Sequence, residues 1–473
     1  MTKALIGLEI HAELMTQTKM FCGCKNEFGA TPNTNVCPVC LGHPGTLPRI
    51  NKGAVEKAVL AGLAMNCQIR KECQMDRKKY FYPDLTKGFQ ISQNEEPLCY
   101  EGYIEIQGEE GAKKVRIERI HIEEDTGKSN HTEDGSTWMD YNRAGVPLIE
   151  IVTYPDMSSG KEARLFLENL KERLKYIGVS DVKMEEGSMR CDVNFNLIGE
   201  ERKTAITEIK NLNSFRAVEK AIDFERERHG EILNQGNSGR KETRRWDDGI
   251  GETVHMRYKE TAADYRLSVE GDLPRIHLSE EFIEDIRKKL PEMPHEKKIR
   301  LMEQYGISEY DANIISAGKT LSDLFEETVN YHKDASKVCD WLLVDVLRLK
   351  NEAEIELSQL KFGAKELGAL ITLVQSGKIN QKTGKKVLRI MFEDGKTPEK
   401  IVEEQGLGQI SDASALEEVV EAVLKDNAQS VEDYHNGKDR AIGYLMGECM
   451  KRTRGKGNPQ LFNSMLLERL KKN

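Results

Sequence analysis

The chain has 473 residues, of which 38% are hydrophobic and 32% charged, and its formal net charge at pH 7 is −9. This length exceeds one compact core, because domains usually run to roughly 100–200 residues, so we expect two or three domains. Charges interrupt every long apolar stretch well before the ~20 residues of a membrane span, so we expect no spanning helix. The negative net charge does not favour a nucleic-acid binder, because phosphates attract positive surfaces.

The N-terminal stretch "MTKALIGLEIHAEL" alternates apolar and polar residues. It lacks the apolar segment and cleavage site of a signal peptide, so we expect a cytoplasmic protein. Because successive side chains of a strand point to opposite faces, Glu9, His11 and Glu13 share one face. The apolar residues share the other face: Ile6, Leu8, Ile10, Ala12 and Leu14. A strand with a solvated polar face would show the same pattern.

Residues 22–40, "CGCKNEFGATPNTNVCPVC", contain two closely spaced cysteine pairs that twelve residues separate: Cys22 and Cys24, then Cys37 and Cys40. Four thiolates close a tetrahedral site and leave no position for substrate, so this spacing predicts a structural zinc ion. An iron–sulfur centre and two pairs of buried free thiols remain as alternatives. The other six cysteines are scattered, and we interpret them as ordinary thiols.

Further carboxylates occur in other predicted strands or at their ends: Glu123, Glu124 and Asp125 in "HIEEDTGK", Glu150 in "VPLIEI" and Asp192 in "MRCDVN". Proteins bind Mg²⁺ through such carboxylates, and substrate phosphates usually complete the coordination. Together with the strand that holds Glu9, these residues indicate a site for a hard cation.

The familiar nucleotide and hydrolase motifs are missing from the sequence. Gly127-Lys128-Ser129 resembles the end of a phosphate-binding loop, but Ile122 occupies the position of its first glycine. There is no Gly-x-Gly-x-x-Gly and no Gly-x-Ser-x-Gly. We therefore predict no hydrolase nucleophile, and a nucleotide would need a different binding site.

The pattern of the chain changes twice along its length. Short alternating runs, typical of a sheet-rich domain with inserted helices, end at two prolines in "LPEMPHEKK", so we place a boundary close to Pro291. The remainder is helical by pattern, and Gly406 and Gly408 separate its last part. From residue 434 to residue 473 there are nine Lys or Arg and three Asp or Glu. This basic tail is the place where we expect a polyanion.

Eight stretches together resemble one family. In chain order they are "GLEIHAEL", "DRKKYFYPDLTKGFQISQ", "HIEEDTGKS", "DYNRAGVPLIEI", "EGSMRCDVN", "EIKNLNSF", "DYRLSVEGDLP" and "GKGNPQLFNSMLLERL". They resemble the B subunits of bacterial aspartyl/glutamyl-tRNA amidotransferases, and the resemblance covers essentially the whole chain. The stretch "DYNRAGVPLIEI" is the most specific of them.

The resemblance implies an α+β fold in three parts. These are a sheet-rich cradle domain (1–290) with a zinc knuckle at 22–40, a helical domain (291–407) and a small helical tail domain (408–473). It also implies a heterotrimer with an amidase (A) subunit and a small C subunit. In that enzyme, the B subunit uses ATP to phosphorylate the side-chain carboxylate of Glu-tRNA(Gln) or Asp-tRNA(Asn), and ammonia from the A subunit then displaces phosphate.

Residue roles follow from the same resemblance. It implies that the catalytic and Mg²⁺-binding residues are Glu9, His11, Glu124, Glu150 and Asp192. It implies that the ammonia channel is lined by Lys78, Tyr80 and Lys87. In the basic tail we expect contacts to tRNA phosphates from Lys451, Arg452, Arg454 and Lys456. The zinc cluster would then support the strand of Glu9 and His11 without entering the site.

The sequence leaves two alternative functions. A zinc-containing RNA-binding protein without catalysis would have many basic and aromatic residues near the cysteines, but that region has few, among them Lys19, Lys25, Arg49 and Phe21. A stand-alone amidase would need a nucleophile that the sequence does not show. Both interpretations therefore have less support in the sequence than a B subunit of an amidotransferase.

Overall fold

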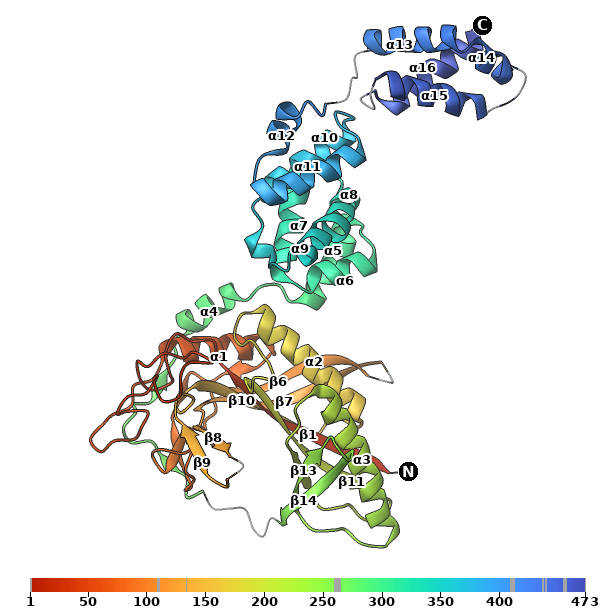
Figure 1. Ribbon diagram of the computed structural model, residues 1–473. Helices are drawn as coiled ribbons and strands as arrows, with labels where there is room; N and C mark the ends of the chain where they lie inside the picture. The colour runs from red at the N-terminus through yellow and green to blue at the C-terminus, as the bar shows by residue number, and fades with distance from the viewer. Residues whose placement is uncertain are drawn as a thin grey trace. The chain divides into compact units, whose positions relative to one another are not determined.

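The computed structural model describes residues 2–108, 111–132, 134–258, 265–408, 413–435, 438, 440–453 and 457–472. Contacts between Cα atoms divide the chain into two compact units, Met1–Met293 and Pro294–Asn473. The first is rich in strands and the second is almost wholly helical (Figure 1). The α+β class predicted from the sequence is therefore confirmed. The division follows Met293, close to the predicted boundary at Pro291.

The first unit is built on one large sheet. Across the sheet, its nine strands are β14 (Glu252–Tyr258), β13 (Glu242–Asp247), β12 (Thr207–Lys210), β11 (Met189–Ile198), β1 (Lys3–Glu13), β10 (Pro147–Thr153), β7 (Gly111–Glu124), β6 (Cys99–Gly108) and β2 (Gln68–Ile69). Neighbouring strands run antiparallel except β12 and β13, which are parallel. The first strand of the chain thus lies near the middle of the sheet, between two strands that come much later in sequence.

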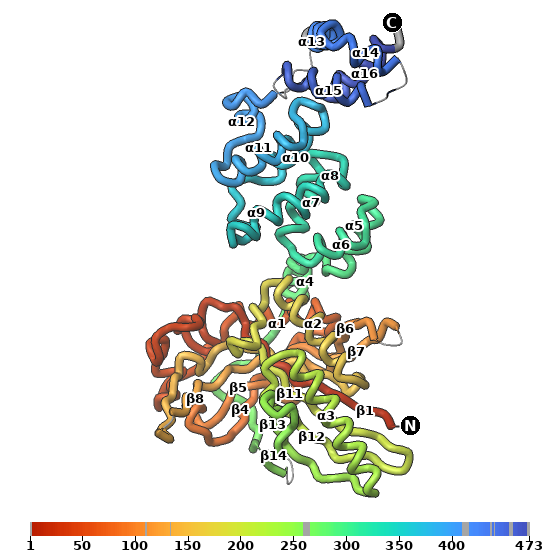
Figure 2. Tube along the Cα trace, turned by 45° about the vertical axis from the view of Figure 1, so that its right-hand side comes forward, coloured from red at the N-terminus to blue at the C-terminus, as the bar shows by residue number. Residues whose placement is uncertain are grey.

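The two faces of this sheet differ in polarity. On β1, Leu8 and Ile10 are 1% and 0% exposed, whereas Glu9 and His11 are half-buried. The apolar face belongs to a hydrophobic cluster that includes residues of three helices: α1 (Lys52–Ala64), α2 (Gly160–Tyr176) and α3 (Phe215–Asn234). Two of these helices, α2 and α3, also pack against each other (Figure 2). The alternation predicted for the first strand is therefore confirmed, and the helices cover its apolar side.

Smaller elements complete the first unit. One is a three-stranded sheet of β15 (Ser268–Val269), β4 (Asp76–Lys79) and β5 (Phe89–Ser92). There are also two strand pairs, β16 (Ile276–His277) with β3 (Glu72–Cys73), and β8 (Lys128–His131) with β9 (Thr137–Asp140). The last element of this unit is helix α4 (Glu280–Lys289). Strand β5 lies beside the end of β7, where the Gln90 side chain donates a 2.8 Å hydrogen bond to the Glu124 carbonyl. This contact places the small sheet next to the acidic end of β7.

The second unit contains two separate groups of buried apolar residues. The first group belongs to α5 (Pro294–Tyr305), α6 (Glu309–Ser316), α7 (Lys319–Tyr331), α8 (Ala335–Cys339), a π-helical stretch (Asp340–Val346), α9 (Leu347–Glu352), a 3-10 turn (Leu357–Gln359), α10 (Ala364–Gln375), α11 (Gln381–Asp394) and α12 (Pro398–Glu404). The second belongs to α13 (Ala413–Asp426), α14 (Ala428–His435), α15 (Arg440–Arg452) and α16 (Pro459–Lys472). No helix in the described part of the chain is both long and apolar enough to cross a membrane.

A buried carboxylate fastens α3 to the edge of the large sheet. Glu225 on α3 is 0% exposed and lies 2.7 Å from the Arg228 guanidinium and 3.4 Å from Arg244 on β13. The Thr253 hydroxyl on β14 donates a further hydrogen bond to it. Burial raises the pKa of Glu225, but hydrogen bonds from His229 and Arg228 outweigh burial and lower the pKa to about 2.

Replacing Glu225 by Gln should destabilise the first unit at neutral pH by about 2 kcal/mol, because Arg228 and Arg244 then keep only one of their two carboxylate partners, Glu242. The folded-state pKa lies below the ordinary value, so this stabilisation is present above about pH 4.5 and is lost as the pH falls toward 2. Urea unfolding at several pH values, with hydrogen exchange of the α3 amides as the local readout, measures the difference.

The matched control is Glu227→Gln, a change at an exposed position of the same helix. It should alter the free energy of unfolding by less than about 0.5 kcal/mol. Equal effects of the two substitutions at pH 7 would contradict a specific role for the buried carboxylate.

Candidate functional site

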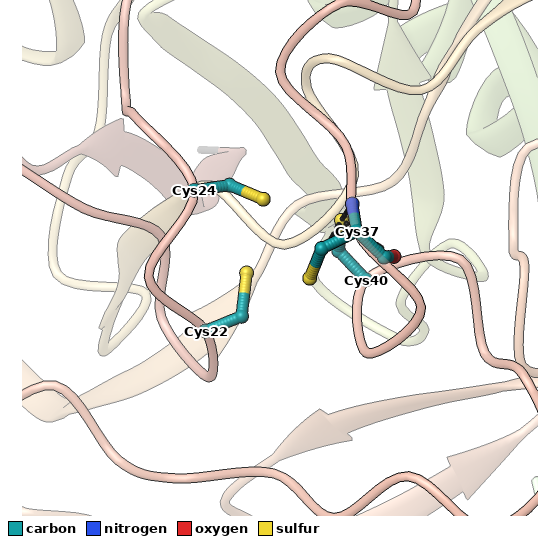
Figure 3. A group of neighbouring side chains, drawn as sticks. All are labelled: Cys22, Cys24, Cys37 and Cys40. Atoms are coloured by element: carbon teal, nitrogen blue, oxygen red, sulfur yellow. Dashed lines mark hydrogen bonds between the residues drawn. The ribbon is translucent and has the colours of Figure 1, made fainter.

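The four cysteines between residues 22 and 40 converge. Their sulfur atoms all lie within 4.8 Å of one another, and two of them, those of Cys37 and Cys40, are 3.9 Å apart. Figure 3 shows the side chains of Cys22 and Cys24 on one arm of the loop pointing toward those of the second pair. Tetrahedral zinc with bonds of about 2.3 Å needs such spacing, so this donor set fits a zinc ion.

The cysteine cluster is tied to the turn before β10 by a buried lysine. Lys19 is 0% exposed, and its ammonium lies 3.6 Å from the Cys40 sulfur and 3.2 Å from the Tyr141 carbonyl oxygen. The Met20 amide also donates to the Gly145 carbonyl at 2.7 Å. A buried charge needs such partners, so the turn and the cysteine loop are held together.

On the polar face of the large sheet, four side chains form a compact group, which we call the His–Glu cluster: His11 on β1, His121 and Glu123 on β7, and Glu150 on β10. Strand register explains it, since Glu150 is paired with His11 on one side and with His121 on the other. Directly opposite residues share a face. The polar face of three adjacent strands thus brings the cluster together.

The distances within the His–Glu cluster are short. The Nε2 atom of His11 lies 3.4 Å from Glu123 and 3.4 Å from Glu150. The Nε2 atom of His121 lies 3.3 Å from Glu150, and the Ser92 hydroxyl donates a 2.9 Å hydrogen bond to Glu123. The Nδ1 atom of His121 is buried and has no hydrogen-bond partner in the described part of the chain.

Opposite charges hold the His–Glu cluster together. Burial lowers the pKa of His11, but hydrogen bonds to Glu123 and Glu150 outweigh burial and raise the pKa to about 10. Burial also lowers the pKa of His121, but the carboxylates of Glu150 and Glu123 outweigh burial and raise the pKa to about 9. Burial raises the pKa of Glu123, but the two imidazoles lower it to about 2. Burial raises the pKa of Glu150 as well, but His121 and His11 outweigh burial and hold it well below its ordinary value, so both carboxylates are ionised at neutral pH.

Three members of this group have the geometry of a metal site. One ligand atom each from His11, Glu123 and Glu150 lies within 4.8 Å of the others. Two carboxylates with open positions for phosphate oxygens suit Mg²⁺, while the imidazole also suits transition metals such as Mn²⁺. Once His11 loses its proton, which binding of a cation would displace, the donor set fits a divalent cation with mixed nitrogen and oxygen ligands.

Glu124 lies apart from the His–Glu cluster. Its side chain points to the other face of β7, as alternation along a strand requires. There it forms an ion pair with Lys87 and accepts a 3.0 Å hydrogen bond from the Ile91 amide. A small cavity of about 50 Å³, lined also by Cys22 and Cys40, lies beside this pair. Glu123, adjacent in sequence, occupies the place that the sequence interpretation gave to Glu124.

Glu9 and Asp192 share the polar face but lie in the next row. They are paired with each other across β1 and β11. Glu9 accepts a 2.8 Å hydrogen bond from Asn194, and Asp192 forms an ion pair with Lys210. Of the five predicted metal ligands, His11 and Glu150 are therefore in contact with each other. Glu9 and Asp192 lie beside this pair on the same face.

The three predicted channel residues occupy two places. The Lys78 ammonium lies 5.9 Å from the centre of the Tyr80 ring and 4.8 Å from that of Tyr265. Lys87 is separate, held by Glu124 and close to the ring of Phe89. Burial raises the pKa of the Tyr80 phenol well above its ordinary value.

Of the four predicted tail contacts, Arg454 and Lys456 lie outside the described residues. Lys451 is in the last turn of α15, with 78% of its side chain exposed and Glu448 at 3.5 Å. Arg452 forms an ion pair with Asp426 of α13. Lys451 is thus the more available of the two described cations.

Sequence reasoning missed His121, named Glu123 only among the acidic strand residues without a role in the metal site, and missed Tyr265. For the first two a signal was present, because "RIHIEE" alternates with a period of two and puts His121 and Glu123 on one face. Tyr265 carried no such signal. Its carbonyl accepts a 2.8 Å hydrogen bond from the Lys79 amide, a contact between segments far apart in sequence.

Comparison with known families and proteins covers nearly the whole chain. The family described as "GatB/GatE catalytic domain" matches residues 4–284, and the one described as "GatB domain" matches residues 323–470. The first description names a catalytic domain, so the alternative of an RNA-binding protein without catalysis receives no support.

Individual relatives agree with these matches. A Finegoldia magna protein, named as the B subunit of an aspartyl/glutamyl-tRNA(Asn/Gln) amidotransferase, is 56% identical over 470 residues, which is 99% of each chain. The protein of the same name from Clostridium botulinum strain Loch Maree is 52% identical over 473 residues, again 99% of each. The chain therefore belongs to the family of aspartyl/glutamyl-tRNA(Asn/Gln) amidotransferase B subunits.

Proposed function

We propose that this chain activates the side-chain carboxylate of Glu or Asp esterified to tRNA by phosphorylating it with ATP, and that ammonia then converts the acyl phosphate to an amide. The names of its relatives support the substrate class. The observation that carries the reaction is the His–Glu cluster, where His11, Glu123 and Glu150 offer metal-ligand atoms on the polar sheet face. Phosphoryl transfer depends on a divalent cation held in such a way.

Two chemical steps make up this reaction. A carboxylate oxygen of the aminoacyl group attacks the γ-phosphorus, and the bond to the bridging oxygen breaks to release ADP. Ammonia then attacks the carbonyl carbon, a proton leaves the nitrogen, and phosphate departs. A bound divalent cation would neutralise charge on the phosphate oxygens. Glu123 and Glu150 would hold that cation, while Ser92 and His121 orient these carboxylates through the contacts described above.

Ammonia needs a path that retains it. Lys78 and Tyr80 with Tyr265 would line one part of this path, and Lys87 with Glu124 another. The cavity beside the Lys87–Glu124 pair, of about 50 Å³, has room for a molecule of the size of water or ammonia. We infer that glutamine supplies the ammonia through an amidase (A) subunit, and that a small C subunit completes the heterotrimer in the cytoplasm.

The cysteine cluster would have a supporting role with zinc bound. It has four sulfur ligands, so it leaves no position for substrate. Through Lys19 it contacts the turn that leads into β10, the strand of Glu150. Zinc would thus stabilise the conformation of the site from outside it.

Replacing both Cys37 and Cys40 by Ser should remove zinc and lower the unfolding temperature of the first unit, because structural zinc contributes folding free energy. Elemental analysis and calorimetry measure the two effects. Cys67→Ser, at a buried cysteine outside the cluster, should keep one zinc per chain. A stable wild-type protein without zinc would contradict this role, and bound iron with visible absorption would indicate an iron–sulfur centre instead.

Glu123→Gln and Glu124→Gln should separate activation from ammonia use. Glu123→Gln should reduce ATP cleavage that depends on Glu-tRNA by about 100-fold or more, because it removes a charge beside the phosphates. Glu124→Gln, like Lys78→Ala, should keep ATP cleavage but form less amide from glutamine, and ammonium chloride should partly restore the product. Phosphate release and amidated tRNA are measured for each variant with both nitrogen donors. Loss of ATP cleavage in Glu124→Gln but not in Glu123→Gln would contradict this assignment and indicate that Glu124, not Glu123, holds the cation.

Lys451→Gln should weaken tRNA binding and reduce the slope of log K against log salt by about one, because one phosphate contact is lost. This variant is cleaner than a truncation, because α15 and α16 bury Leu445 and Phe462 in the tail's apolar core. Filter binding at several salt concentrations provides the slope. Lys365→Gln on α10 is the exposed control, and an equal slope change there would show that the effect is not specific to the tail.

A further inference from the structure

The cysteine cluster lies between two cavities. One of them, of about 430 Å³, has Cys37 and Leu47 in its wall, and Leu47 is 64% exposed, so this cavity is open to solvent. The other is the small cavity beside Lys87 and Glu124, and Cys40 lies in its wall. A small molecule from solvent can therefore reach the sulfur atoms from one side, while the Lys87–Glu124 pair lies on the other.

The two cysteines of the second pair differ in accessibility. Cys37 is half-buried, whereas Cys40 is only 4% exposed. The Cys40 sulfur accepts a 3.1 Å hydrogen bond from the Cys37 amide and lies 3.6 Å from the Lys19 ammonium, so donors shield it. The two sulfur atoms are 3.9 Å apart (Figure 3). An accessible thiolate beside a second cysteine that can displace its oxidised form is the arrangement of redox-sensing cysteines.

Peroxide would react with this pair in two steps. Cysteines that bind zinc are thiolates, which are the reactive form. In the first step the Cys37 sulfur attacks one oxygen of hydrogen peroxide, the oxygen–oxygen bond breaks, and hydroxide leaves. In the second step the Cys40 sulfur attacks the resulting sulfenic acid of Cys37, the disulfide forms, and a second hydroxide leaves. Two thiolates are thus oxidised to one disulfide, and one peroxide is reduced to two hydroxide ions.

The disulfide would also change the surroundings of the cluster. It removes two of the four sulfur ligands, so zinc would no longer be retained. The Lys19 ammonium, which is 0% exposed, would keep only its contact to the Tyr141 carbonyl, and a buried charge without an anionic partner is costly. The Cys40 carbonyl accepts a 2.8 Å hydrogen bond from the hydroxyl of Thr86, the neighbour of Lys87. Both the turn before β10 and the segment of Lys87 are therefore tied to the reduced cluster.

We propose that Cys37 and Cys40 form a peroxide-sensitive site, where oxidation to a disulfide releases zinc and reduces amide formation by loosening the turn before β10 and the Lys87–Glu124 pair. The inference rests on the proposed function, since it assumes bound zinc and an ammonia path beside Lys87. A thiol reductant together with zinc reverses the oxidation.

The test uses the assembled enzyme with zinc bound, treated with hydrogen peroxide. A chromogenic chelator measures the zinc released, and mass spectrometry of alkylated peptides identifies the disulfide. One zinc per chain should be lost as the Cys37–Cys40 disulfide forms. Hydrogen exchange should become faster at the amides of residues 141–146, and less amide should form from glutamine. Dithiothreitol with added zinc should restore both.

Two ligand replacements separate this pair from the rest of the cluster. Cys37→His keeps a zinc ligand but cannot form the disulfide, so peroxide should release its zinc at least about tenfold more slowly than from the wild type. The matched control is Cys24→His, which retains both Cys37 and Cys40 and should lose zinc as fast as the wild type. If Cys37→His does not fold, the disulfide identified in the wild-type enzyme decides the question.

The remaining outcomes count against the proposals in different ways. A purified wild-type enzyme without zinc contradicts the supporting role of zinc given above, and zinc release fails with it. Zinc that peroxide does not release, or a disulfide between Cys22 and Cys24 instead, overturns only the peroxide-sensitive site. A Cys37–Cys40 disulfide that leaves hydrogen exchange at residues 141–146 and amide formation unchanged overturns its effect on the reaction.

Discussion

Burial of one sheet face against α1, α2 and α3 is the constraint on which the rest of the first unit depends. It requires apolar side chains at every second position of the central strands, and it leaves the alternate positions free for charge. His11 and Glu150 occupy such alternate positions on adjacent strands. The His–Glu cluster is thus a product of the same periodicity that builds the hydrophobic core.

The same periodicity shows how far the sequence could predict the site. The α+β class and the faces of β1 followed from alternation and are confirmed. Which of Glu123 and Glu124 lies on the same face as His121 could also have followed from it, because neighbours in a strand point to opposite sides. The family resemblance indicated Glu124 as a metal ligand. In the structure Glu123 lies beside His11, whereas Glu124 forms an ion pair with Lys87.

Other features depended on pairings that no local pattern contains. Lys87 meets Glu124 only because β5 lies beside β7, and Tyr265 meets Lys78 only because β15 pairs with β4. Lys19 carried no sign of its burial, since a lone lysine is usually exposed. Sequence patterns determine which side of an element is polar, whereas these contacts are set by the order of strands in the sheets.

The position of β1 also has a consequence for synthesis of the chain. Its partners β10 and β11 end at Thr153 and Ile198, so the strand that is made first finds its neighbours late. At about 5–20 residues per second, the ribosome needs on the order of 10–40 s to supply them. During that time the apolar side of β1 has no sheet to join, and such contacts of large sequence separation form slowly. The strand that contributes His11 therefore leaves the ribosome before the others but has no partner in the sheet until β10 has been made.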